Sequence, residues 1–257
     1  MIEIGIGKIV IMFFMCILAG FIDSVAGGGG LVSLTSYYAI GLPPIYAIGN
    51  NKFSSTFGTL FATINYARKG DVVLKIAIFA SVFAILGSAL GAHMALLFAS
   101  SIFQYVLLIV LPVMTFFTLY KPRLKKKREA LDIDDIGIGT YAFIVMIGFA
   151  IGIYDGFFGP GTGMFFTLAL SFIGLPMIKA CGTTKLINLA SNVAALLTFI
   201  INGSIIYKLG IPCVVASVIG NLIGSEFAIK KGDRAIKPLI VVVIVLLYAK
   251  IVLDLVL

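Results

Sequence analysis

The sequence has 257 residues, of which 61% are hydrophobic and only 12% are charged, and its mean hydropathy is +1.15. A water-soluble domain needs about a quarter of its residues charged, so the composition excludes an ordinary soluble protein. Residues 76–120 carry no Asp, Glu, Lys or Arg, which is room for two membrane helices of roughly 20 residues each. These features predict an all-α, polytopic membrane protein of the cell membrane, with the lipid bilayer as a partner.

The apolar segments form two sets of five. The second segment of each set has only about 13 residues, so it is either a short crossing or the return arm of a re-entrant hairpin. We predict two membrane repeats, residues 1–120 and 137–257, joined by a basic linker at 121–136. The predicted segments are 7–24, 29–41, 48–67, 73–97 and 101–119 in the first repeat, and 138–157, 161–174, 182–202, 206–229 and 237–256 in the second.

The two sets repeat one sequence pattern at an offset of 133 residues. GLPPIYAIGNNK, from Gly41 to Lys52, matches GLPMIKACGTTK, from Gly174 to Lys185. GSALGAHMA, which begins at Gly87, matches GNLIGSEFA, which begins at Gly220. Shared glycines, prolines and lysines at equal spacing favour a duplicated unit.

Loop charge predicts that the two units are inverted. The loop at 68–75 is basic and its counterpart at 202–206 is nearly neutral, whereas the loop at 230–237 is basic and its counterpart is neutral. Loops rich in Lys and Arg stay in the cytoplasm. We therefore expect the linker 121–136 and the loop 230–237 in the cytoplasm and both termini outside, with Lys8 as the one dissenting charge.

The basic residues behind the net charge of +8 cluster in these loops. We interpret them as determinants of membrane orientation, and they give no reason to expect a nucleic-acid partner. The chain has one His, three isolated Cys and no cluster of carboxylates. That inventory predicts neither an enzyme with catalytic residues nor a metal site. No cofactor is expected, although coupling to a proton or to sodium stays open, as does the choice between a monomer and a homo-oligomer.

Each repeat carries a glycine-rich interruption, GFIDSVAGGGG from Gly20 to Gly30 and GIYDGFFGPGTG from Gly152 to Gly163. Glycine and proline are poor helix formers, so the helices should break there in mid-membrane. A break exposes the first N–H groups of the next helix and its positive dipole end, which suits an anion. The predicted substrate-binding residues of the two breaks are Gly27, Gly28, Gly29 and Gly30, and Gly159, Gly161, Thr162 and Gly163. For the paired glycines Gly87, Gly91, Gly220 and Gly224, close helix packing is the preferred interpretation.

Lys52 and Lys185 occupy matching positions just inside the third segment of each repeat. A cation with polar neighbours near the broken helices suits a small anionic substrate. The alternative is that each lysine extends to the nearby membrane interface. Polar residues that accompany the lysines, and that line a path or form interhelical hydrogen bonds, are Asn50 and Asn51 in the first repeat and Thr183, Thr184, Asn188 and Asn192 in the second.

Asp23 and Asp155 recur four residues ahead of their glycine loops. Ionisable residues inside membrane segments are costly and tend to be functional. Three roles are open for them: carrying a coupling proton or gating, pairing with a lysine of the opposite repeat, or capping loop N–H groups.

Two halves that each carry a glycine motif, a GLP step and a polar-Lys step resemble the TauE/SafE family of sulfite exporters, also called the toluene sulfonate uptake permease family. GFIDSVAGGGG and GLPPIYAIGNNK carry the most specific part of this resemblance. It implies transport of small sulfur-containing or organic anions such as sulfite, sulfonates or sulfoacetate. We therefore expect a secondary transporter whose substrate lies between two inverted repeats near the membrane midplane, with an anion channel or uncoupled facilitator as the alternative.

Overall fold

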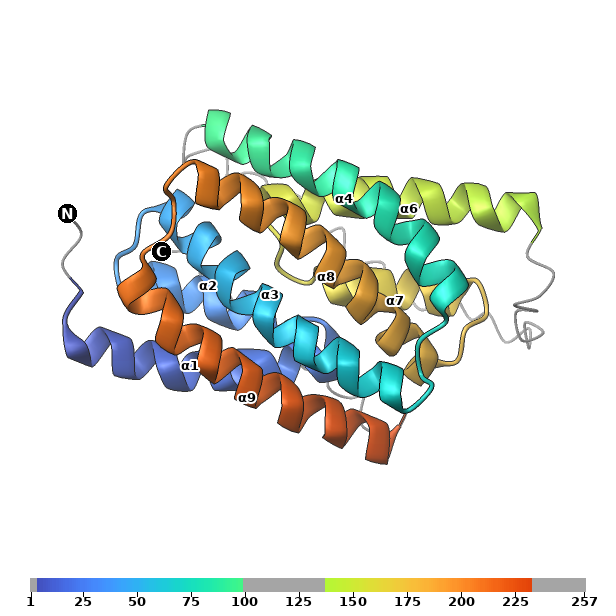
Figure 1. Cartoon of the computed structure of the whole chain (residues 1–257), viewed down its shortest axis with the longest axis horizontal. Helices are drawn as coiled ribbons and strands as arrows, with labels where there is room; N and C mark the ends of the chain where they lie inside the picture. The colour runs from blue at the N-terminus through green and yellow to red at the C-terminus, as the bar shows by residue number, and fades with distance from the viewer. Residues whose placement is uncertain (1–3, 99–136, 233–257) are drawn as a thin grey trace, which may run out of the picture.

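The structure is a computed structural model and describes residues 4–98 and 137–232. Every regular element in these two ranges is a helix (Figure 1). The predicted segments at 101–119 and 237–256 and the linker at 121–136 lie outside the described residues. The helices are α1 (Ile6–Ala26), α2 (Gly29–Ala39), α3 (Pro44–Arg68) and α4 (Leu74–Leu97) in the first predicted repeat, and α6 (Ile138–Phe157), α7 (Thr162–Phe172), α8 (Met177–Ile201) and α9 (Tyr207–Lys231) in the second predicted repeat.

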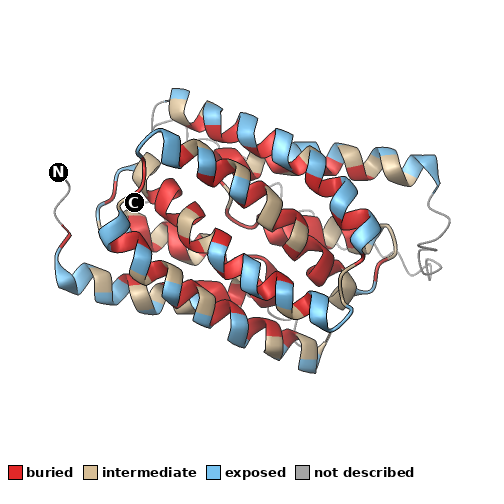
Figure 2. Cartoon of the chain, viewed as in Figure 1, coloured by how far each residue is buried: buried red, intermediate tan, exposed pale blue. Residues whose placement is uncertain are grey.

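Five of these helices, α1, α4, α6, α8 and α9, are long and apolar enough to cross a membrane. Buried residues gather between the helices, while the outer faces expose large apolar side chains such as Phe14, Ile78 and Ile211 (Figure 2). An apolar outer surface of this extent is favourable in lipid and unfavourable in water. The predicted polytopic membrane architecture is therefore confirmed. Helix α3 also has 25 residues but is more polar, because Asn50, Asn51 and Lys52 lie within it.

The helices break at both glycine-rich motifs, as the sequence predicts. Helix α1 ends at Ala26, where Gly27 takes a left-handed conformation with φ +74°, and α2 begins at Gly29. The second break lies between α6 and α7, and Gly159 and Gly161 there have φ values of +94° and +80°. Only glycine adopts such angles without strain, which is why these positions end the helices.

The short helices α2 and α7 have 11 residues each. At 1.5 Å per residue each is about 16 Å long, roughly half the thickness of the hydrocarbon core. Each starts in the middle of the bundle and runs to one of its ends, and α2 returns toward the end at which α1 begins (Figure 1). The short segments are therefore return arms that begin at mid-depth.

The fourth helix of each repeat packs mainly against helices of the other repeat. Helix α4 packs along α6 and α8, and α9 packs along α1 and α3 (Figure 1). Glycines allow this contact, because a Cβ added to any of them would meet backbone of the opposing helix. These are Gly87 and Gly91 of α4, facing Phe149 and Ile153, and Gly220 and Gly224 of α9, facing Ile17 and Phe21. The close-packing interpretation of these four glycines is confirmed. The fourth helix of each repeat therefore packs among helices of the other repeat.

Matching helices of the two repeats run in opposite directions along the bundle; α3 and α8 show this most clearly (Figure 1). The basic residues Arg68, Lys69, Lys179 and Lys231 consequently lie near one end. Lys8 lies at the opposite end, where its ammonium donates a hydrogen bond of 2.7 Å to the carbonyl oxygen of Ile40. This contact satisfies a terminal carbonyl of α2 and gives the dissenting lysine a local role.

Single cysteines at Lys69 and Asn202 should be modified from opposite faces of the membrane, with Lys69→Cys on the cytoplasmic side. Both positions are exposed, and the native Cys16, Cys181 and Cys213 are buried, so background labelling should be small. The measurement is labelling of intact cells with a membrane-impermeant maleimide, before and after permeabilisation. Labelling of Lys69→Cys in intact cells would reverse the predicted orientation, and same-side labelling of both variants would refute the loop assignment.

Candidate functional site

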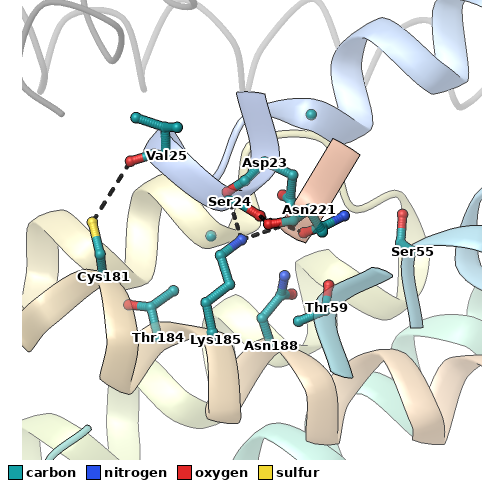
Figure 3. Close-up of polar contacts among 12 residues, drawn as sticks. Asp23, Ser24, Val25, Ser55, Thr59, Cys181, Thr184, Lys185, Asn188 and Asn221 are labelled. Carbon is teal, nitrogen blue, oxygen red and sulfur yellow. Dashed lines mark hydrogen bonds and ion pairs between the residues drawn. The ribbon is translucent and has the colours of Figure 1, made fainter. Parts of the chain in front are cut away.

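Each of the two matching lysines pairs with the aspartate of the other repeat. The Lys52 ammonium on α3 lies 2.8 Å from Oδ1 of Asp155 on α6. The Lys185 ammonium on α8 lies 2.6 Å from Oδ2 of Asp23 on α1 and also donates a hydrogen bond to the Asp23 backbone carbonyl (Figure 3). Of the three roles open for the aspartates, the structure places both in ion pairs that tie one repeat to the other.

The Lys52–Asp155 pair is the more deeply buried, with both side chains only 2% exposed. Each partner also makes a further hydrogen bond: Lys52 donates to Asn192 at 2.9 Å, and Ser191 donates to Asp155. Buried charges need such partners because desolvation otherwise outweighs their attraction. In the second pair the Asp23 side chain is 15% exposed. The two ion pairs thus occupy matching positions in the sequence but differ in the solvent exposure of their aspartates.

The structure rules out the alternative interpretation, in which the lysines extend to the membrane interface. Lys52 and Lys185 are each 1% exposed. Their helices begin earlier than the sequence suggests, at Pro44 and Met177, because Pro43 and Pro176 act as N-terminal boundaries. Each lysine therefore lies more than two turns inside its helix and points into the bundle.

The two glycine-rich breaks touch each other at the centre of the bundle. The amide of Met164 donates a hydrogen bond of 3.2 Å to the carbonyl of Gly27. A Cβ at Gly27 would overlap the backbone of Gly163 and Met164, and one at Gly163 would lie 2.8 Å from the Gly27 Cα. Side chains at these two positions would force the breaks apart.

A cavity lies between the breaks and the two ion pairs, with a volume of about 280 Å³ including its open side. Little of this volume is wide enough for a water molecule. Eleven of the residues predicted from the sequence line it, together with Ser55. They are Asp23, Gly27, Gly30, Asn51, Lys52, Asp155, Gly159, Thr162, Gly163, Asn188 and Asn192.

The other predicted residues do not line this cavity. Gly28 and Gly161 form the breaks themselves, and Lys185 reaches the cavity through Asp23. Thr183 accepts a hydrogen bond from the backbone of Val73, and Thr184 bonds to Thr167, so both connect α8 to neighbouring elements. The remaining two are Asn50, which donates to the Tyr46 carbonyl, and Gly29, which lines a second cavity described below.

One amide side chain in the cavity wall has a hydrogen-bond acceptor without a partner. The side-chain oxygen of Asn188 is buried without a hydrogen-bond partner, as is the hydroxyl of Thr59 on α3. Figure 3 shows both side chains beside Lys185, in the space between α8 and α3. Buried polar groups are nearly always paired, so an unpaired amide in a cavity wall is typical of a position that a ligand or water occupies.

Two residues that the sequence analysis did not assign to the site also shape this region. Ser191 holds Asp155, and Asn221 on α9 accepts a hydrogen bond from Ser24 beside Asp23 (Figure 3). Ser191 belongs to the polar face that also carries Asn188 and Asn192, and Asn221 is the one amide side chain of α9. A buried amide among apolar residues is a signal that could have identified Asn221.

Comparison with known proteins agrees with the fold and the motifs. The family model described as sulfite exporter TauE/SafE matches residues 12–251. The chain belongs to the TauE/SafE family. It is 34% identical to the probable membrane transporter protein ORF9 of a Sinorhizobium species, over 95% of this chain and 92% of that protein. No solved structure matches the chain.

Two further relatives in the family carry similar names. A probable membrane transporter protein of Haemophilus influenzae is 32% identical over 98% of this chain and 97% of its own length. The probable membrane transporter protein YfcA of Escherichia coli K12 is 33% identical over 95% of this chain and 89% of its own length. The chain is thus a TauE/SafE membrane transporter and not an enzyme, and its similarity to these relatives extends through both repeats.

Proposed function

We propose that this transporter is a secondary carrier of small anions, and that the anion binds in the cavity between the two glycine-rich breaks. The observation that carries the proposal is the pair of buried Lys–Asp bridges, each of which joins one repeat to the other beside a broken helix. A carrier needs charged groups that can exchange partners when the substrate arrives, and these two lysines are the cations at the cavity.

The backbone adds to the attraction for an anion. Gly30 lies in the first turn of α2, and Thr162 and Gly163 lie in the first turn of α7; all three line the cavity. The first N–H groups of a helix have no partner within it and carry its positive dipole end. Two such ends, with the Lys52 ammonium between them, form a site suited to a carboxylate, sulfite or sulfonate group.

The narrowness of the cavity suggests how binding and movement are linked. An anion of several atoms enters only if the wall moves, and the two ion pairs are contacts at this wall that join one repeat to the other. Parting them releases contacts between the repeats. In our proposal the repeats are inverted copies that rock about the glycine contact, which the opposite directions of matching helices support.

The substrate class that we propose is a small sulfur-containing or organic anion, such as sulfite, a sulfonate or sulfoacetate. The family description names sulfite. The polar wall of amides, hydroxyls and backbone N–H groups suits oxyanions, which accept several hydrogen bonds at once.

Neutralising Lys185 should abolish saturable anion uptake. The assay measures uptake into proteoliposomes of externally added sulfite, alkyl sulfonates and carboxylates. We expect Lys185→Gln to lower uptake at least about 100-fold, because a buried charge pair is lost at the site. The matched control is Lys230→Gln, whose lysine is 69% exposed and pairs with Glu226. Flux that rises linearly with substrate in the wild type would favour a channel, and unchanged saturable flux in Lys185→Gln would remove this lysine from the mechanism.

A further inference from the structure

The charges at the proposed anion site already cancel. Lys52 and Lys185 are paired with Asp155 and Asp23, and each ion pair has a 2% exposed ammonium. An anion added to a balanced, buried cluster brings an uncompensated negative charge, which low-dielectric surroundings penalise by several kcal/mol. A cation that enters with the anion removes this cost. This step rests on the proposed anion site.

A second cavity lies on the other side of Asp23. It is enclosed by α1, α2, α3 and α9, and the oxygen-bearing side chains in its wall are Asp23, Ser33, Ser54, Ser55, Ser217 and Asn221. Asp23 and Ser55 line both cavities. The free space inside is about that of one water molecule, which is also the space of a small dehydrated cation.

Two hydroxyls in this wall have their hydrogen committed to protein acceptors. Ser54 donates to the backbone carbonyls of Asn50 and Asn51, and Ser33 donates to the side-chain oxygen of Asn51 at 2.6 Å, so their lone pairs are left for another partner. The Ser217 hydroxyl accepts one hydrogen bond from the side-chain amide of Asn221 at 3.3 Å and keeps a second lone pair. Oxygen lone pairs beside a carboxylate are what a hard cation coordinates.

The matching place in the other repeat is more apolar. At the offset of 133 residues, Ser33, Ser54 and Ser217 correspond to Phe166, Ile187 and Ala84, whereas Ser55 and Asn221 correspond to the polar Asn188 and Ser88. Phe166, Ile187 and Ala84 are completely buried in an apolar cluster. Three of the cavity's hydroxyls therefore do not recur at the matching positions of the other repeat.

We propose that the hydroxyl-lined cavity binds a sodium ion that accompanies the anion. The ion is held by the Asp23 carboxylate and the serine hydroxyls on α2, α3 and α9. Because the same carboxylate pairs with Lys185, a cation at Asp23 weakens that pair and leaves the ammonium available to the anion (Figure 3). Cation and anion then occupy adjacent cavities that share Asp23 and Ser55 in their walls, and each favours the binding of the other.

The test is sodium-dependent thermal unfolding of the purified chain in detergent, without any substrate, so that it does not depend on transport. In the wild type, sodium chloride should raise the melting temperature relative to choline chloride and potassium chloride. Ser54→Ala and Ser217→Ala should each raise the half-maximal sodium concentration about tenfold or more. Thr63→Val is the matched control, because its buried hydroxyl on α3 donates to the Thr59 carbonyl and lines neither cavity.

Equal melting temperatures in sodium and choline would overturn the proposal, and so would sodium stabilisation that is the same in Ser54→Ala, Ser217→Ala and the wild type. Anion uptake driven by a pH gradient and indifferent to sodium would assign the accompanying charge to a proton, and would leave the anion carrier standing without the sodium site. Sodium stabilisation without any anion uptake would instead refute the carrier and keep the cation site.

Discussion

Lys52→Met is expected to be the most destabilising single substitution at the ion pairs, costing about 3–5 kcal/mol of unfolding free energy. The substitution leaves the buried carboxylate of Asp155 without its ion-pair partner. Asp155 is 1% exposed, and without the lysine its carboxylate keeps only the hydroxyl of Ser191. The measurement is thermal unfolding of the purified variant in detergent at low salt.

A double-mutant cycle separates the ion pair from lost packing. Lys52→Met combined with Asp155→Asn should recover most of the lost stability, because no unpaired charge remains buried. Lys185→Met should cost less than Lys52→Met, since Asp23 is partly exposed and water can solvate it. A double variant as unstable as the sum of the two single variants would show that the charges do not stabilise one another.

Gly27→Ala is expected to prevent the folded protein from accumulating, although it adds one methyl group. Two effects combine. The left-handed conformation of Gly27 costs a residue with a Cβ about 1–2 kcal/mol, and the added carbon would overlap the backbone of Gly163 and Met164. Backbone cannot rotate away as a side chain does, so the contact between the two breaks is lost. The measurement is the yield of monodisperse protein and its melting temperature.

Gly30→Ala is the matched control within the same run of glycines. A Cβ at Gly30 would lie 3.5 Å from the Cα of Pro160, an ordinary contact, and Gly30 lies within α2, where alanine favours the helix. We expect Gly30→Ala to fold as the wild type does, so any change in its uptake reports on the cavity alone. Equal yields of Gly27→Ala and Gly30→Ala would contradict the proposed packing of the breaks.

Much of the architecture follows from composition and spacing. The apolar segments predicted the helices, and the glycine runs predicted where α1 and α6 end, because backbone propensity and hydropathy act locally along the chain. The matching lysines and aspartates were also visible as a repeat. Their pairing stayed undecided, since the sequence left Asp23 and Asp155 with three roles, one of which was pairing with a lysine of the opposite repeat, and left the lysines with two.

The amino-acid sequence alone determined the membrane class, the family resemblance and the two helix breaks, each of which depends on residues close together along the chain. Only the tertiary structure decided which lysine meets which aspartate, that α4 and α9 each pack against helices of the other repeat, and that a Cβ has room at Gly30 but not at Gly27. These are contacts between residues far apart along the chain. Their geometry depends on how the two repeats pack together, and local spacing carries no information about it.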